Sequence, residues 1–223
     1  VAYGTTAGGC NYYIGPFKIV TDLAETDTGV VSLDKAGGWV RIGGNNEDGK
    51  GAAVATAVCF SPALNGTLVC EARVELRIIT TTNAFVGFCG TIADDVAEPL
   101  TATGTTLTLT AAAICGFLFD SQLTALEWHM PYNGGTATGP TNSDDVDSDV
   151  LPVAAESVIL RVEIDPNGTA RWYIDGVLKQ TVVNAVSTTT LLGALVGAWG
   201  TTTTATDIDC DYFAVRAQRD SNI

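Results

Sequence analysis

The sequence predicts an all-β protein, a two-sheet antiparallel sandwich, and three observations carry this prediction. First, every second residue of 158–164 is hydrophobic, and the positions between them include Arg161 and Glu163. This alternation is typical of a half-buried strand. Second, the pairs Asn167-Gly168 and Asp175-Gly176 are strong short-range signals for hairpins. Third, no segment keeps a helical repeat for more than a turn or two. Strands joined by short turns without helices build sandwiches.

The N-terminal half is expected to supply short strands separated by turns. Residues 1–20 contain tyrosines and a Gly-Pro break, so we expect an N-terminal arm there and a single domain over 21–223. Within that domain, 39–42 and the apolar run 52–60 are the first expected strands.

The cleanest expected strand is 67–79, which follows an Asn-Gly turn. Its hydrophobic residues face one side, and the other side carries Glu71, Arg73, Glu75 and Arg77. Two carboxylates four residues apart on one strand are separated by about 13 Å. Glycoside hydrolysis needs a pair about 5–9.5 Å apart. This charged row is therefore expected to be an ion-paired exposed face or a subunit contact.

The rest of the chain continues the strand pattern. Short alternating or apolar runs predict strands at 84–90, 105–110, 111–119 and 127–130, followed by a turn-rich acidic loop over 131–152. The C-terminal third adds the expected strands 158–164, 170–174, 191–199 and 208–216.

Charge limits the classes of partner. The 223 residues carry a formal net charge of −14, and no basic patch is evident. Nucleic acids and anionic membranes attract basic surfaces, so neither is expected as a partner. No apolar run approaches the ~20 residues of a membrane helix. Charged residues make up 16% of the chain, below the roughly 25% of ordinary soluble domains. This suits burial against other subunits or, equally, a β protein rich in small residues with an ordinary solvated surface.

The six cysteines show no metal-ligand spacing such as CxxC. Five of them lie in strand-like runs, so we expect buried free thiols that pack as small hydrophobic residues. A disulfide framework is the alternative, although a core of this size does not require one. The expected positions in strands are Cys59, Cys70, Cys89, Cys115 and Cys210.

No residue set predicts catalysis, a metal or a cofactor. His129 is the single histidine, without a G-x-S-x-G nucleophile motif, and is expected on a loop or an edge strand. Carboxylates from Asp145 follow the EF-hand positions 1, 3, 5 and 12, but Val150 replaces the glycine needed at position 6. We therefore expect the cluster Asp144–Asp149 to be a solvated acidic loop, with weak cation binding as the alternative.

One group of residues resembles a sugar-binding platform. Trp128, Tyr132 and Asn133 lie close together in the sequence, beside a Gly-Gly pair. Aromatic rings stack on the apolar faces of sugars, and an amide can bond to hydroxyl groups. The alternative is that Trp128 belongs to the core or to an interface. A glycan is accordingly a candidate ligand.

Three groups of segments together resemble a known superfold. They are TLVCEARVELR at 67–77 with FVGFCG at 85–90, ICGFLFD at 114–120 with EWH at 127–129, and VILRVEIDPNGTARWYIDG at 158–176 with DYFAVR at 211–216. This succession resembles the concanavalin A-like, laminin-G-like jelly-roll sandwich. The motifs are strand-and-turn motifs, which specify a fold and leave function open.

Within that superfold, the chain is most similar to capsid decoration, or cement, proteins of tailed bacteriophages. The resemblance implies a non-enzymatic protein of the outer capsid surface of the virion, assembled in the host cytoplasm. It also implies that the partner is the major capsid protein and that the chain forms homo-oligomers, commonly trimers. Aromatic residues of the arm and of a long loop are the expected partner contacts, namely Tyr3, Tyr12, Tyr13, Trp128 and Tyr132.

Two other functions stay open at this stage. The first is a carbohydrate-binding module or lectin, including one that serves adhesion on a virion. The second is a glycan-cleaving enzyme, but the laminarinase-like motif E-x-D-x-x-E has no match here. Of the alginate-lyase-like motifs, 71–77 mimics only the alternation of R-[ST]-E-[LV]-R, and Q-[IV]-H and Y-x-K-x-G-x-Y are missing.

Overall fold

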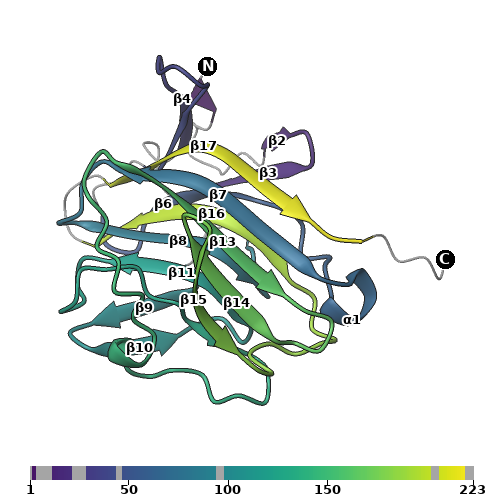
Figure 1. The fold of residues 1–223 in the computed structure, drawn as a ribbon. Coiled ribbons are helices and arrows are strands. Elements are labelled where there is room, and N and C mark those ends of the chain that lie inside the picture. The colour runs from purple at the N-terminus through teal and green to yellow at the C-terminus, as the bar shows by residue number, and fades with distance from the viewer. Residues whose placement is uncertain are drawn as a thin grey trace.

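Two large antiparallel sheets stacked face to face make up the computed structural model of the chain (Figure 1). The structure describes residues 2–3, 12–21, 29–43, 47–93, 98–201 and 206–218. The eight-stranded sheet has the order β1 (Ala2–Tyr3), β4 (Gly29–Ser32), β5 (Val40–Gly43), β17 (Asp207–Arg216), β7 (Leu68–Leu76), β13 (Ser157–Ile164), β14 (Ala170–Ile174) and β15 (Val177–Val182). The seven-stranded sheet has the order β12 (Tyr132–Asn133), β11 (Ile114–Asp120), β8 (Thr82–Cys89), β16 (Gly193–Gly200), β6 (Gly51–Ala55), β3 (Phe17–Thr21) and β2 (Tyr12–Ile14).

Little else is regular. A separate hairpin pairs β9 (Leu100–Thr103) with β10 (Thr106–Leu109). One helical turn, α1 (Pro62–Asn65), and a 3-10 turn, η1 (Ser143–Asp145), are the helices of the described residues. Neither is long enough to cross a membrane, and no other described segment is helical. The all-β, two-sheet prediction is confirmed.

The predicted C-terminal hairpins form as expected. The β14–β15 turn places Asp175 and Gly176 at φ +49° and +78°, the positive angles that a two-residue hairpin of this twist requires. In the preceding turn, Gly168 donates its N–H to the Asp165 carbonyl at 2.9 Å. The sequence did not predict β15 itself, the edge strand after this turn.

The main core lies between the two sheets. On β7 the residues predicted to face inward are fully buried, while β13 and β14 bury alternate residues. Trp172 projects from β14 across the core, and its indole N–H donates to the Gly116 carbonyl of β11 at 2.8 Å. This bond satisfies a buried donor and ties one sheet to the other.

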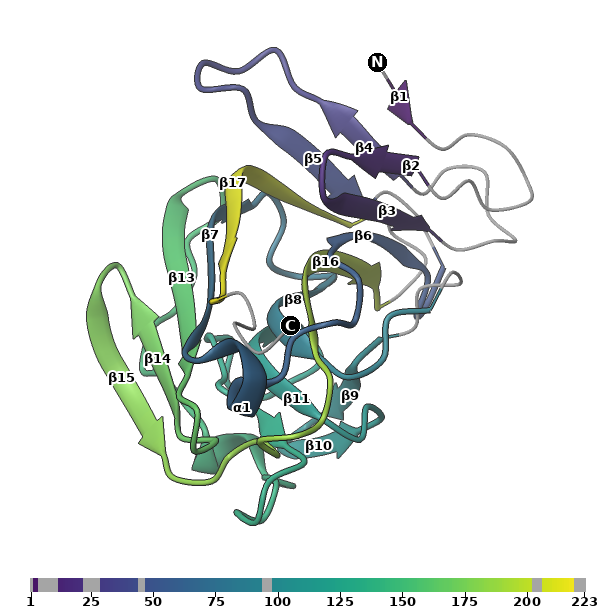
Figure 2. The same cartoon turned by 90° about the vertical axis from the view of Figure 1, so that its right-hand side faces the viewer.

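The seven-stranded sheet is buried on both faces over its central strands. Every residue of β8, β11 and β16 is buried, whichever way its side chain points. On the side away from the main core, residues 91–93, 98–99 and 110–111 pack against Ala53, Cys89 and Leu195. The β9–β10 hairpin lies near this part of the fold (Figures 1 and 2), and β9 buries alternate residues. The central strands therefore present no open face.

Two sequence-based boundaries differ from the structure. The expected arm over 1–20 is wrong for residues 12–20, because β2 and β3 pair with each other and β3 pairs with β6. Residues 4–11 lie outside the described residues. The expected strand 127–130 is reduced to single bridges, where His129 pairs with Leu118 on one side and with Asp147 on the other.

Candidate functional site

The charged row on β7 meets partners on its neighbouring strands. Arg77 Nη2 lies 2.6 Å from Asp207 Oδ2, and Arg73 Nη1 lies 3.1 Å from Asp211 Oδ2. All of these side chains point away from the core, on the outward side of the eight-stranded sheet. The prediction of an ion-paired face is therefore confirmed, and we call this surface the polar face.

A β-bulge in β17 places an additional polar side chain on the polar face. The register shifts between Cys210 and Tyr212, so two consecutive residues, Asp211 and Tyr212, both contact side chains of that face. A bulge of this kind re-aims a side chain locally. The Tyr212 hydroxyl donates to Glu71 Oε1 at 3.0 Å, which holds Glu71 in a fixed position.

The connection between β4 and β5 covers one part of the polar face. Lys35 Nζ in this connection lies 2.5 Å from Glu75 Oε2 and 3.9 Å from the centroid of the Trp39 ring. The Arg73 guanidinium lies 5.4 Å from the same ring. Trp39 is thereby buried at the surface of the sheet. The β13–β14 side of the polar face remains uncovered.

A pocket of about 490 Å³ occupies this uncovered part. Arg161 donates to Glu163 and lies 3.9 Å from Glu71 Oε2. The Tyr173 hydroxyl donates to Glu163 Oε2 at 3.2 Å. The pocket is lined by Glu71, Ile159, Arg161, Glu163, Tyr173, Asp175, Gly176 and Tyr212, and we call it the tyrosine pocket.

The two phenols of the tyrosine pocket stay protonated. Burial, with the hydrogen bond to Glu71 as the second cause, raises the pKa of Tyr212 to about 12. Burial and the neighbouring charge of Glu163 also raise the pKa of Tyr173. Both hydroxyls are therefore donors, directed at carboxylates, at all physiological pH values.

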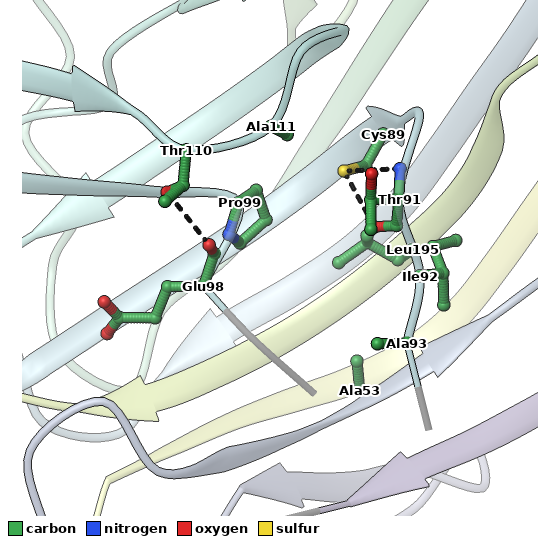
Figure 3. Close-up of a pocket in the computed structure, with 10 residues that line it drawn as sticks. All are labelled: Ala53, Cys89, Thr91, Ile92, Ala93, Glu98, Pro99, Thr110, Ala111 and Leu195. Carbon is green, nitrogen blue, oxygen red and sulfur yellow. Dashed lines mark hydrogen bonds between the residues drawn. The ribbon is translucent and has the colours of Figure 1, made fainter. Parts of the chain in front are cut away.

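A second, smaller pocket of about 160 Å³ lies on the covered side of the seven-stranded sheet (Figure 3). Its wall is mostly apolar, with Cys89, Ile92 and Leu195 among the lining residues. Figure 3 shows the Glu98 carboxylate pointing away from these three side chains. Glu98 is nevertheless one of the residues that line the pocket, together with the polar residues Thr91 and Thr110.

Glu98 belongs to a partly buried carboxylate cluster with Asp120. Burial, with the Asp120 charge as the second cause, raises the pKa of Glu98 to about 7. Burial raises the pKa of Asp120 to about 6. Asn83 donates to Glu98 Oε1 at 3.2 Å. Perturbed carboxylates mark functional sites or structural strain alike, and Glu98 also lines the small pocket of Figure 3.

His129 lies in single bridges beside β11, in keeping with the expected loop or edge-strand position, and its side chain is fully buried. Its Nδ1 lies 2.9 Å from Asp147 Oδ1, and its Nε2 lies 3.1 Å from the Ala125 carbonyl. Both ring nitrogens are engaged within the protein. The contact between His129 and Asp147 joins the two ends of the segment 129–147. Because the imidazole is buried there, it cannot reach a substrate. No sequence signal links His129 with a carboxylate 18 residues away.

The expected aromatic platform is not present at the surface. Trp128 is 0% exposed and packs edge-on against Phe119, with ring centroids 5.9 Å apart. The prediction that Trp128 contacts a partner or stacks on a glycan is therefore wrong. The alternative, a core tryptophan, holds. Tyr132 and Asn133 are half-buried in β12, and the Tyr132 ring lies 6.1 Å from that of Trp172.

The other expected contacts fall outside what the structure describes. The backbones of Tyr3, Tyr12 and Tyr13 lie in β1 and β2. Their side chains are not among the described ones, so their expected role stays a prediction.

The acidic loop faces solvent for the most part. Asp144, Asp145 and Asp149 are exposed, as predicted, whereas Asp147 turns inward to His129. In the described ranges, no group of three or more His, Cys, Asp or Glu side chains is arranged to hold a metal ion.

The described cysteines are free thiols, which confirms that prediction for Cys70, Cys89, Cys115 and Cys210, all buried. Burial raises the pKa of the Cys210 thiol to about 12 and raises that of Cys70 still further. Cys59 is the exception, because it is exposed after the end of β6.

Comparison with known proteins identifies the fold. No known protein family matches the sequence, and no curated protein does. Solved structures match over most of the chain. A β-glucanase of Bacillus licheniformis is 14% identical with a TM-score of 0.55, and covers 97% of this chain and 99% of its own.

Two further structures extend this similarity. The carbohydrate recognition domain of Emp47p is 11% identical with a TM-score of 0.56, over 90% of this chain and 95% of its own. The alginate lyase AlyC3 is 10% identical with a TM-score of 0.58, over 88% and 80%. The chain is thus a concanavalin-like jelly-roll sandwich, as predicted, and its structural neighbours are carbohydrate-binding or glycan-active proteins. At these identities the likeness concerns the fold alone.

Proposed function

We propose that this chain is a non-enzymatic structural protein of a tailed bacteriophage, which decorates the outer capsid and bridges copies of the major capsid protein. The observation that carries the non-enzymatic part is the closure of the seven-stranded sheet. Its central strands are buried on both faces, and the single imidazole is buried beneath the loop. A chain whose seven-stranded sheet is covered in this way is suited to binding and bridging.

The described surface offers apolar contacts for such a partner. Leu151 and Val153 are 68% and 53% exposed on the loop before β13. At one edge of the eight-stranded sheet, Val177 and Leu178 of β15 are also well exposed. Exposed large hydrophobic residues that gather locally mark interaction sites. Together with Tyr3, Tyr12, Tyr13 and Tyr132, these residues are the proposed contacts with the shell.

Oligomerisation and location complete this proposal. The chain would assemble as a trimer on the virion surface, after synthesis in the reducing host cytoplasm, where free buried thiols persist. Sedimentation equilibrium of the purified chain tests the oligomeric state. If the chain is monomeric both in solution and when bound to shells, the trimer proposal is wrong.

Co-sedimentation with shells of the major capsid protein of the same virus tests the decoration. Wild-type chain is expected in the pellet. The double variant Leu151→Asn/Val153→Asn and the triple variant with Tyr3, Tyr12 and Tyr13 changed to Ala are expected to bind more weakly. Glu156→Gln, on an exposed residue of the same loop region, is the control. If wild-type chain stays in the supernatant at every salt concentration, the decoration proposal fails.

A carbohydrate-binding module is the second candidate, and one observation favours it. The tyrosine pocket combines two phenols, carboxylates and a guanidinium in one open depression. A glycan array that captures the chain while shells do not would make this the better account.

A further inference from the structure

We propose that the tyrosine pocket is a binding site for an uncharged saccharide, whose hydroxyl groups bond to Glu71, Glu163 and Arg161. This deepens the second candidate function above, and it holds whether or not the chain also decorates a capsid. The site lies on the outward side of the eight-stranded sheet, away from the closed seven-stranded sheet.

The register of the strands builds the pocket. Arg161 of β13 lies directly opposite Glu71 of β7 on one side and Tyr173 of β14 on the other. Side chains two residues apart on a strand point the same way, so Glu163 stands beside Arg161. The bulge in β17 adds Tyr212 at the β7 side. Four strands thus contribute neighbouring polar groups to one depression.

The polar groups hold one another in place before any ligand arrives. Tyr212 is bonded to Glu71, and Tyr173 and Arg161 are both bonded to Glu163. The Arg161 guanidinium also lies 5.5 Å from the Tyr173 ring. At one end, Asp175 Oδ1 accepts the Ile159 N–H at 2.9 Å and fixes the hairpin turn. Such pre-organisation lowers the ordering cost of binding.

The donors and acceptors of the pocket that have no partner within the protein determine which ligand can bind. A carboxylate offers about four lone-pair positions, and Glu71 and Glu163 use only some of theirs. The Arg161 Nε–H is buried without a hydrogen-bond acceptor, but the Arg161 side chain as a whole is 39% exposed, so a ligand meets the guanidinium through its other N–H groups. A hydroxyl group both donates to a carboxylate and accepts from a guanidinium, so vicinal hydroxyls match both needs.

Charge and shape narrow the choice further. Three carboxylates against one guanidinium leave the lining negatively charged, which repels uronic and sialic acids. Ile159 and the tyrosine rings provide apolar surface for the C–H face of a sugar. The volume, about 490 Å³, lies in the range of about 300–1,000 Å³ of small-ligand sites. A neutral sugar unit satisfies all three conditions.

A printed array of neutral, acidic and N-acetylated mono- to hexasaccharides provides the test, followed by titration of the best neutral probe. Glu163→Gln and Tyr173→Phe are expected to weaken binding about tenfold or more, because each removes part of the charge-assisted network. Tyr132→Phe and Glu156→Gln are the matched controls outside the pocket and should bind as wild type. Unchanged melting temperatures show that all four variants fold.

Three results would overturn the proposal. In the first, the array captures no chain through any saccharide. In the second, the chain prefers acidic sugars to neutral ones. In the third, Tyr132→Phe loses saccharide binding while Glu163→Gln and Tyr173→Phe keep it. N-acetyl-arginine amide and its neutral citrulline analogue give a further test, because saturable binding of the arginine probe alone would make the pocket a receptor for basic side chains. Shell co-sedimentation of Glu163→Gln and Tyr173→Phe should be unchanged, so failure of decoration and failure of this site are distinguishable.

Discussion

The outward sides of the two sheets differ in what lies over them. On the eight-stranded sheet, charged side chains of neighbouring strands pair with one another and leave an open pocket. On the seven-stranded sheet, loops bury the central strands and trap a histidine and several carboxylates. The comparison shows that one sandwich can cover the outward side of one sheet while keeping part of the outward side of the other available for contacts.

The largest expected effect comes from the closed half. Trp128→Ala removes a fully buried indole from the core and is expected to lower the free energy of unfolding by about 3–5 kcal/mol. Chemical denaturation measures this, with Leu151→Ala, on an exposed residue, as the control near zero. A loss below about 1 kcal/mol would mean that Trp128 is not a core residue, and the division into a closed and an open side would weaken.

Glu98 gives the next effect, and it depends on pH. Its pKa is raised to about 7 from an ordinary 4.5, so the folded state binds the proton more tightly than the unfolded state. Stability contributed by this group is therefore full below about pH 4.5 and is lost as the pH rises through about 7. Glu98→Gln is expected to add about 2 kcal/mol to the free energy of unfolding at pH 8, and almost nothing at pH 4.5. Equal effects at both pH values would contradict the assigned burial.

The open half should respond weakly to the loss of one ion pair. Arg77 is 44% exposed, whereas the side chain of its partner Asp207 is 6% exposed and also lies 3.7 Å from Arg41 Nε. Exposed charges contribute about 0–1 kcal/mol to such pairs, and Arg41 still neutralises Asp207 when Arg77 is removed. Arg77→Ala is thus expected to change the unfolding free energy by less than about 1 kcal/mol, and by less still in 1 M salt. A change of several kcal/mol, insensitive to salt, would show that the polar face is a structural core in its own right.

Thiol reactivity gives the smallest change in stability and sharpens the same contrast. Denatured chain should titrate about six thiols without reductant, one for each cysteine of the sequence. In the native chain, Cys59 is expected to react first among the described cysteines, because the other four are buried. Cys59→Ser should remove that fast phase and leave stability within about 0.5 kcal/mol. Persistence of the fast phase would assign it to another cysteine, and three disulfides would favour the secreted-lectin alternative.

The alternation of hydrophobic and polar residues allowed the central strands of the eight-stranded sheet to be predicted from the sequence. Residues 67–77 separate charged from hydrophobic positions, and the Asp-Gly pair marks a hairpin, so β7, β13 and β14 could be predicted together with the ion-paired face. The apolar run at 84–90 predicted the strand β8, but not that both of its faces are buried, nor what covers the second face.

The positions missed by sequence reasoning depend on long-range contacts. Trp128 has polar neighbours in the sequence, which favoured exposure, yet the pairing of 128–130 with 146–150 carries it into the core. The tyrosine pocket was missed for a related reason. Glu163, Tyr173 and Tyr212 come from three strands, and the β17 bulge that directs Tyr212 has no signal in the residues around it.

The temperature at which capsids release their DNA tests the central claim most directly. Capsids that lack the chain are heated with and without added purified chain, and a dye reports the released DNA. The proposed cement role predicts that the chain raises the release temperature, and that Leu151→Asn/Val153→Asn raises it less than wild type does. An unchanged release temperature, at concentrations where the chain saturates the shells, would contradict the claim that this sandwich stabilises a capsid.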